Sequence, residues 1–224
     1  DIICSAAMLM VLSPLLLLIA LLIKLYDGGP VFYKQDRLTK DGRVFQVYKF
    51  RSMRVDSEKD GARLAMKGDS RVTPVGKVLR NIHFDELPQL WNVVKGDISL
   101  VGPRPCVSYE LGDFETLNKK YKKRFEMRGG ITGLAQIKGR NENSWDEKVT
   151  YDNIYIDEFK KQGIWLDIKI LAGTVAKVFK KQDIYEEKAD KEMNDAEAAK
   201  FAEEEIIRIA HLPDEEITET VGIK

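Results

Sequence analysis

The chain opens with a continuous apolar run. Residues 2–23 contain no charged side chain and are mostly Leu, Ile, Met, Val and Ala. As an α-helix that rises about 1.5 Å per residue, this run reaches roughly 33 Å, which is enough to cross the hydrocarbon core of a bilayer. A buried core helix is the alternative, but so long an uncharged run favours a membrane segment.

Ser13 and Pro14 interrupt this run near its middle. Proline removes one backbone hydrogen bond and clashes with the preceding turn, so we expect a kink or a break, with the Ser13 hydroxyl bonding a freed carbonyl. Two arrangements fit: a kinked span, or a helix that dips into one leaflet and returns. Basic residues that follow closely place the rest of the chain on the cytoplasmic side. They are Lys24, Lys34, Arg37, Lys40 and Arg43.

The next two segments predict a β-hairpin. Residues 31–37 and 44–50 alternate in strand fashion, and the Asp-Gly pair at 41–42 supplies the positive φ that a hairpin turn requires. The second strand runs into Lys49 and Arg51, which share a face by alternation and could bind a phosphate together. A solvated basic strand edge is the alternative.

Two carboxylates, Asp85 and Glu86, stand side by side before another apolar-periodic segment. Asp is a favoured N-cap, so Asp85 is expected to cap a helix that runs to about Lys95. A carboxylate at a helix start is favoured in its ionised form, and the same helix end attracts a phosphate. An ordinary capping Asp followed by a first-turn Glu is the alternative. The predicted buried stripe is Leu87, Leu90, Trp91 and Val94.

Two arginines near this pair are candidates for anion binding. Thr73-Pro74 predicts a helix start through its cap and first-turn proline, and Arg80 lies near the end of that helix. Pro103 and Pro105 fix the backbone on both sides of Arg104. A guanidinium held this stiffly is suited to bidentate phosphate binding.

Two further helices are predicted at residues 145–161 and 164–181. The second carries an apolar stripe that includes Trp165, with lysines elsewhere, and is suited to lying in the headgroup plane. A core-packed helix is the alternative. Residues 183–224 are rich in Ala and Glu, with a helix expected over about 194–210.

Charge is divided unevenly although the net charge is zero. The segment 183–224 holds 14 Asp/Glu and 5 Lys/Arg, against 22 Asp/Glu and 31 Lys/Arg before it. A basic body beside an apolar segment suits an anionic partner such as a lipid headgroup or a phosphate ester. No nucleic-acid recognition motif accompanies the basic residues, so no nucleic-acid partner is expected. Cys4 and Cys106 lack metal-ligand spacing and indicate a reducing compartment.

Several of these motifs occur together and in order over residues 1–181, and the set resembles the bacterial sugar transferases, the monotopic polyprenyl-phosphate phosphoglycosyl transferases. The conjunction is specific although each motif alone is not. Besides Ser13-Pro14, the motifs are Lys49-Phe-Arg-Ser-Met53, Asp85-Glu-Leu-Pro-Gln89, Leu100-Val-Gly-Pro-Arg-Pro105 and Gly130-Ile-Thr-Gly133. One departure is Gly129, where the family usually has proline, and a looser loop is expected there.

The resemblance implies a reaction and a topology. A UDP-sugar gives its sugar-1-phosphate to polyprenyl (undecaprenyl) phosphate and releases UMP, through a covalent phosphosugar intermediate on Asp85. It also implies Mg²⁺ at Asp85 and Glu86, and a re-entrant helix broken at Ser13-Pro14 in the bacterial inner (cytoplasmic) membrane, with the catalytic domain on the cytoplasmic face. Arg140 and Asp152 resemble residues of the family's nucleotide-side segment and become candidate substrate contacts.

The chemistry of the individual residues agrees with this interpretation. A carboxylate that attacks a diphosphate needs cations around the anionic oxygens, and Lys49, Arg51, Arg80 and Arg104 supply them. Glu86 is the second catalytic candidate, either as a metal ligand or in proton transfer. The expected architecture is a mixed, helix-rich α/β fold. It consists of a membrane helix at 1–24, a small catalytic domain at 25–182 with a β-hairpin and interfacial amphipathic helices, and an acidic appendage at 183–224. A non-catalytic, membrane-tethered module that binds anionic lipid or nucleotide is the alternative function.

Overall fold

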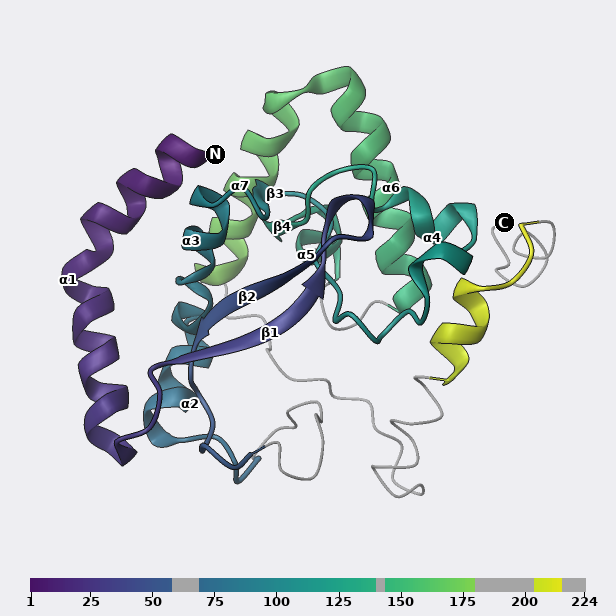
Figure 1. Ribbon diagram of the computed structural model, residues 1–224. Coiled ribbons are helices and arrows are strands. Elements are labelled where there is room, and N and C mark those ends of the chain that lie inside the picture. Colours follow the sequence, from purple (N-terminus) through teal and green to yellow (C-terminus); the bar gives the residue numbers. More distant parts are fainter. Residues whose placement is uncertain (58–68, 140–143, 180–203, 215–224) are drawn as a thin grey trace.

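The computed structural model describes residues 1–57, 69–139, 144–179 and 204–214, and it has the expected helix-rich α/β architecture (Figure 1). The α-helices are α1 (Ile2–Asp27), α2 (Pro74–Asn81), α3 (Gln89–Val94), α4 (Lys119–Lys123), α5 (Leu134–Lys138), α6 (Trp145–Gln162) and α7 (Ile164–Phe179). The 3₁₀ turns are η1 (Lys40–Gly42), η2 (Phe84–Glu86) and η3 (Phe114–Thr116). The strands are β1 (Phe32–Leu38), β2 (Val44–Phe50), β3 (Ser99–Val101) and β4 (Gly130–Thr132).

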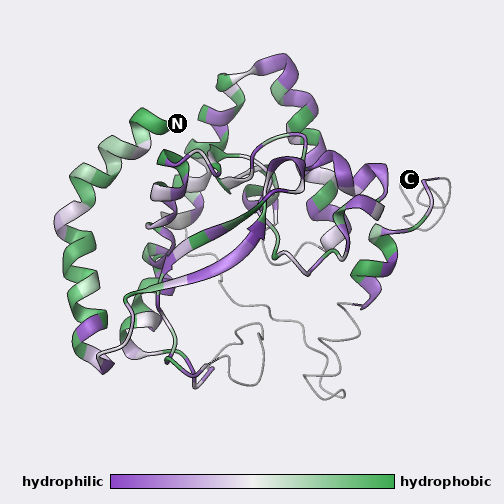
Figure 2. Cartoon of the chain, viewed as in Figure 1, coloured by the Kyte–Doolittle hydropathy of each residue, from purple (hydrophilic) through white to green (hydrophobic). Residues whose placement is uncertain are grey.

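Helix α1 is apolar over nearly its whole length and long enough to cross a membrane (Figure 2). Pro14 lacks the N–H that would bond the Met10 carbonyl, and the Ser13 hydroxyl donates to that carbonyl at 2.8 Å, as predicted. Figure 1 shows the helix changing direction near its middle. Gly28 ends it in the left-handed conformation, with its N–H on the Lys24 carbonyl. Most apolar side chains of α1 stay exposed, so only one face is used for packing.

The C-terminal half of α1 packs on the rest of the protein through a small apolar cluster. Ile19 and Ile23 of α1 lie with Phe50 at the end of β2 and Leu79 of α2, and Phe84 of η2 packs against them. The turn that carries the two adjacent carboxylates therefore lies beside the membrane helix.

The predicted hairpin is confirmed. Strands β1 and β2 pair antiparallel from Phe32–Phe50 to Leu38–Val44, and η1 closes the turn with positive φ at Asp41 and Gly42. The alternation in β2 turns Phe45 and Val47 inward, where they pack on Val93 and Ile98.

A second, smaller sheet holds β3 parallel to β4. Val101 of β3 lies in a core cluster with Tyr155 and Ile156 of α6 and with Leu166 and Ile170 of α7. Beyond these buried positions α7 leaves an apolar set exposed, namely Ile164, Trp165, Ile168, Leu171 and Val175.

The helix predicted from Asp85 to Lys95 is wrong at its start. Asp85 lies inside η2 and makes no cap, and α3 begins only at Gln89 after Pro88. The predicted stripe is also shifted: Trp91 is exposed, whereas Asn92 and Val93 are buried. The reason is a polar one. Asn92 accepts from the Tyr48 N–H at 3.0 Å and donates to the Gln46 carbonyl at 2.7 Å, so α3 is fixed to β2 through an amide.

Part of the predicted acidic appendage packs on the domain. Residues 204–210 are helical, Ala210 is fully buried, and its carbonyl accepts from the Asn118 N–H at 2.9 Å just before α4. His211 continues this contact with a ring nitrogen 2.9 Å from the Leu111 carbonyl. Residues 194–203 of the expected helix lie outside the described residues.

Candidate active site

The turn η2 is introduced by a residue in an unusual conformation. His83 has φ 58° and ψ 20°, a left-handed conformation that costs a residue with a side chain about 1–2 kcal/mol. It reverses the chain after α2, so that Phe84 packs toward α1 while Asp85 and Glu86 follow in the turn. Strained backbone of this kind is often found where function fixes a side chain, and here it immediately precedes the two carboxylates.

Glu86 is the anchor of the site. Its Oε1 atom accepts from Lys49 Nζ at 2.7 Å and from Arg104 Nη2 at 3.0 Å, which joins β2, η2 and the loop after β3. Burial alone would raise the pKa of Glu86, but the attraction of the two cations overrides it and holds the pKa well below the ordinary value. Glu86 is therefore ionised throughout the physiological range.

The cations of this cluster differ in exposure. The Lys49 side chain is 19% exposed and the Glu86 side chain 16%, whereas the Arg104 side chain is 40% exposed. Burial lowers the pKa of Lys49, although Glu86 opposes this shift. Glu86 raises the pKa of Arg104. Arg104 is thus the cation that an incoming anion reaches most directly.

Asp85 has the opposite environment to its neighbour. It is buried and, among the residues that the structure describes, forms no ion pair. Burial and the adjacent Glu86 charge raise its pKa to about 6, and Lys49 and Arg80 act against this rise. Two carboxylates in one turn are thus held in different states: one is neutralised by cations, and the other is ionised near neutral pH without a fixed partner. An unpaired carboxylate among cations is a chemically available nucleophile.

Arg80 belongs to the same region. Thr73 caps α2 as predicted, accepting from the Gly76 N–H at 2.9 Å, and Arg80 lies in the last turn of this helix. Its charge acts on Asp85, and its buried Nη1 atom has no hydrogen-bond partner within the described part of the chain. Lys49, Arg80 and Arg104 are therefore brought together around Asp85 and Glu86.

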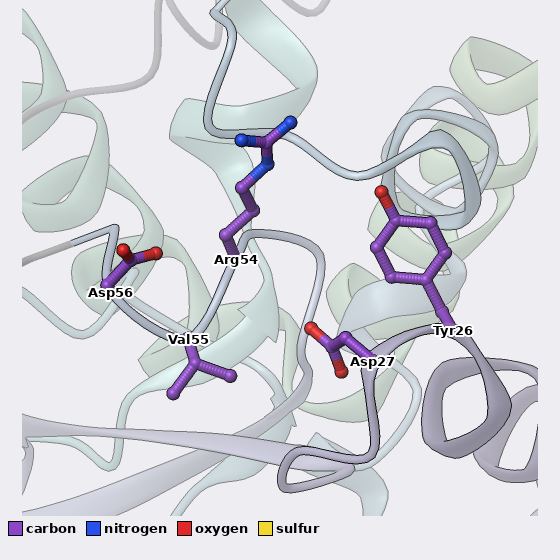
Figure 3. Close-up of a pocket in the computed structure, with 5 residues that line it drawn as sticks. All are labelled: Tyr26, Asp27, Arg54, Val55 and Asp56. Carbon is purple, nitrogen blue, oxygen red and sulfur yellow. The ribbon is translucent and has the colours of Figure 1, made fainter.

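Arg51 is not part of this cluster. The Arg51 N–H still bonds the Val31 carbonyl at 2.9 Å, but the Arg51 guanidinium pairs with Asp27 at the end of α1 and not with Glu86. Asp27 also lines an open cleft of about 700 Å³ together with Tyr26 and residues 54–56 (Figure 3). Neither Asp85 nor Glu86 lines this cleft. The Asp27–Arg51 contact instead attaches the membrane helix to the hairpin.

Asp152 is also separate from the carboxylate turn. It is buried in α6 and pairs at 2.8 Å with Arg124, and both side chains are nearly inaccessible at 2% and 3% exposure. Burial raises the pKa of Asp152 to about 6, while Arg124 acts in the opposite direction. Arg140, the other candidate nucleotide contact, lies outside the described residues.

The loop at Gly129 is held rather than loose. The Gly129 N–H, which a proline would lack, donates to Thr39 Oγ1 at 3.1 Å, and its carbonyl accepts from the Ser99 N–H at 2.7 Å. A Cβ at this position would lie 2.5 Å from the Pro105 ring, so the loop packs directly against the segment that carries Arg104. The expectation of a looser loop is wrong, because the Gly129 N–H, which a proline would not have, forms a hydrogen bond that holds the loop.

A metal at this site would need oxygen ligands beyond the protein. Within the described residues no group of three or more His, Cys, Asp or Glu side chains could hold a metal ion. Mg²⁺, however, is commonly bound by one or two carboxylates together with substrate phosphates and water. Asp85 and Glu86 fit that donor set, provided that the substrate carries phosphate oxygens.

Comparison with known proteins identifies the family of the chain. The family model described as bacterial sugar transferase matches residues 1–181. The chain is 44% identical over 190 residues to the UDP-glucose:undecaprenyl-phosphate glucose-1-phosphate transferase of Klebsiella pneumoniae, covering 83% of this chain and 40% of the relative. It is 43% identical over 178 residues to an Aeromonas hydrophila UDP-N-acetylgalactosamine-undecaprenyl-phosphate N-acetylgalactosaminephosphotransferase, with 78% and 41% covered.

A shorter relative is matched along most of its length. It is an uncharacterised sugar transferase of Bacillus subtilis, 40% identical over 185 residues, with 82% of this chain and 87% of the relative covered. The chain therefore spans less than half the length of the Klebsiella and Aeromonas relatives and nearly all of the Bacillus one. On the family model and these identities, the chain belongs to the bacterial sugar transferase family.

Proposed function

We propose that the protein transfers sugar-1-phosphate from a UDP-sugar to polyprenyl (undecaprenyl) phosphate through a covalent intermediate on Asp85. The names of the Klebsiella and Aeromonas relatives support the reaction class. The observation that carries the proposal is the pair of unlike carboxylates in η2: Glu86 fixed by Lys49 and Arg104, and Asp85 without an ion-pair partner in the described residues.

In the first step, an Asp85 oxygen attacks the phosphorus that bears the sugar. A bond forms between Asp85 and this phosphorus, the bond to the bridging oxygen of the diphosphate breaks, and UMP leaves with the electron pair. Asp85 needs no general base, because a carboxyl with a pKa of about 6 is already ionised at neutral pH.

In the second step, an oxygen of the polyprenyl phosphate attacks the same phosphorus. The bond to Asp85 breaks, the carboxylate is regenerated, and polyprenyl-diphospho-sugar is released. Negative charge accumulates on the phosphoryl oxygens in both steps, and preorganised cations stabilise such transition states. Arg104 would supply part of this charge, since it is part-exposed and contacts Glu86. Arg80 would supply the rest, and within the described residues its buried Nη1 atom has no hydrogen-bond partner.

Mg²⁺ is proposed as the cofactor. Asp85 and Glu86 would hold it together with diphosphate oxygens, and the ion would neutralise charge on the diphosphate. The proposal predicts that EDTA removes UMP release and that Mg²⁺ restores it. Full activity in EDTA would contradict this role.

The membrane arrangement is also a proposal. The bend at Pro14 and the Ser13–Met10 bond suit a helix that enters one leaflet and returns, and the exposed apolar side chains of α7 suit contact with the same membrane surface. An Asp1→Cys variant in a Cys4→Ser background should react with an impermeant maleimide only in inside-out vesicles of the cytoplasmic membrane. Labelling only in right-side-out vesicles would indicate a full span.

The function itself is tested by UMP release. Purified protein in detergent should release UMP from a UDP-sugar in the presence of undecaprenyl phosphate, and Asp85→Asn should remove this activity while the protein stays folded. A panel of UDP-sugars would identify the sugar. Product formation by Asp85→Asn near the unmutated rate would exclude the mechanism, and binding of nucleotide without any turnover would favour a non-catalytic module.

A further inference from the structure

The backbone around Arg104 is held from outside its own loop. Pro103 and Pro105 have no N–H, so this short segment offers mainly carbonyl groups for hydrogen bonding. Arg124 Nη2 donates to the Arg104 carbonyl at 2.7 Å, and Arg37 Nη1 donates to the Pro105 carbonyl at 2.6 Å. Two arginines thus bind consecutive carbonyls of the loop that carries Arg104. One of them lies at the end of α4 and the other in strand β1.

Arg124 is itself fixed on several sides. The same Nη2 atom that contacts Arg104 lies 2.8 Å from Asp152 Oδ2, and the guanidinium lies over the Trp145 ring, 5.0 Å from its centroid. Trp145 and Asp152 both belong to α6, so this helix sets the position of Arg124. Because Arg124 and Asp152 are almost fully buried, neither can meet substrate directly.

These contacts form a continuous path into the active site. From Asp152 the path runs 2.8 Å to Arg124, 2.7 Å to the Arg104 backbone, and then through the Arg104 side chain 3.0 Å to Glu86. On the proposed function, we infer that Arg124, held by Asp152, is a positioning residue that fixes the guanidinium of Arg104 for the phosphoryl group. Asp152 thereby acts indirectly, by holding Arg124, and does not contact the nucleotide.

A neighbouring ion pair provides a matched control. Lys120 of α4 pairs with Asp146 of α6 at 2.5 Å, and it joins the same two helices as Arg124 and Asp152 without a hydrogen bond to the Arg104 loop. A loss of helix docking would appear in variants of either pair. A loss of Arg104 positioning would appear only in variants of Arg124 or Asp152.

The kinetic test is a double-mutant cycle between Arg124→Lys and Arg104→Ala. Arg124→Lys keeps a positive charge beside Asp152 but removes the guanidinium whose Nη2 atom contacts both Asp152 and the Arg104 carbonyl. It should lower kcat/KM about 10- to 100-fold in the wild-type background. In the Arg104→Ala background the loss should be at most about 2-fold, because Arg124 acts only by positioning the Arg104 side chain, which this variant lacks. Lys120→Met should change kcat/KM by less than about 2-fold in both backgrounds. Equal losses from Arg124→Lys in both backgrounds would overturn the inference.

A second readout is independent of turnover. In substrate-free protein with ¹⁵N-labelled arginine, the Nε–Hε signal of Arg104 can be assigned from its loss in Arg104→Lys. This signal should move toward that of exposed arginines in Arg124→Lys and stay in place in Lys120→Met. An unchanged Arg104 signal in folded Arg124→Lys would overturn the positioning role. If the wild-type protein releases no UMP, the proposed function fails, and the spectrum still decides the positioning.

Discussion

Two ion clusters contact the Arg104 loop, one part-exposed and one closed, and this difference separates the proposed chemistry from structural support. The Glu86 cluster joins one ionised carboxylate to two cations, and one of these, Arg104, is 40% exposed. The Arg124–Asp152 cluster joins one cation to one carboxylate, and both are closed to solvent. The Glu86 cluster keeps positive charge available for an incoming anion, whereas in the Arg124–Asp152 cluster the two charges neutralise each other away from solvent.

The difference shows that burial alone does not identify a catalytic carboxylate. Asp85 and Asp152 are both buried, and burial raises the pKa of each to about 6. Asp152 is paired at 2.8 Å within a sealed contact between helices, whereas Asp85 lies beside the open cluster and has no ion-pair partner in the described residues. On the proposed function, the neighbouring cations and the lack of an ion-pair partner in the described residues, and not the raised pKa, mark Asp85 as the reactive carboxylate.

The largest expected effect is on stability at the closed pair. Asp152→Ala leaves Arg124 as a buried unpaired charge, which should lower the free energy of unfolding by about 3–5 kcal/mol. Asp146→Ala removes the partner of Lys120 from a part-buried pair whose side chains are 17% and 15% exposed, and it should cost less, about 1–2 kcal/mol. Chemical unfolding in detergent, followed by tryptophan fluorescence, measures both. Similar losses from the two variants would remove the distinction between the closed pair and an ordinary ion pair.

At the open cluster the main effect should be on rate. Lys49→Met removes one of the two cations on Glu86 and should lower kcat/KM for UMP release about 10²- to 10³-fold, as for loss of one preorganised charge donor. Lys120→Met is a matched control, because Lys120 has a similar short contact and similar exposure in its pair with Asp146. If the control loses as much activity as Lys49→Met, the effect belongs to the fold and not to the site.

Asp85 should make the folded protein less stable near neutral pH. Its folded-state pKa of about 6 exceeds the ordinary 3.8, so the unfolded chain releases this proton first and stability falls as pH rises from about 4 to 6. Asp85→Asn has no such proton. In metal-free buffer it should match the wild-type free energy of unfolding near pH 4 and exceed it above pH 6, by at most about 3 kcal/mol. An advantage that is largest at low pH would contradict the assignment.

The smallest effect is expected at Gly129, which packs against Pro105 next to Arg104. In Gly129→Ala the new Cβ would lie 2.5 Å from the Pro105 ring, so the segment carrying Arg104 must shift. Overpacking of this kind should cost about 1–2 kcal/mol and lower kcat/KM a fewfold. Gly96→Ala separates backbone strain from packing, because Gly96 has positive φ and an added Cβ there would meet no atom within 4 Å. Gly96→Ala should therefore lower stability through backbone strain but leave kcat/KM unchanged, and an equal loss of kcat/KM in both variants would show that Pro105 does not transmit the change.

The sequence predicts the local chemistry of this site better than its geometry. The hairpin, the Thr73 cap and the Ser13 hydrogen bond follow from short-range rules of turns, caps and proline. The Lys49–Glu86–Arg104 contact joins three elements distant in sequence, so no periodicity predicts it. Strand alternation likewise does not indicate that Arg51 pairs with Asp27 of α1 while Lys49 pairs with Glu86. The prediction for Trp91 fails because the buried face of α3 is set by the polar side chain of Asn92, which a pattern of apolar residues cannot indicate.

The most direct test of Asp85 as nucleophile is the mass of the protein after mixing with a UDP-sugar in the absence of polyprenyl phosphate. The account predicts that the intact mass rises by one sugar-phosphate, that the adduct maps to the peptide containing Asp85, and that undecaprenyl phosphate then removes it. Asp85→Asn should show no adduct. A wild-type enzyme that releases UMP on addition of the acceptor, yet never carries an adduct at Asp85, would contradict the account.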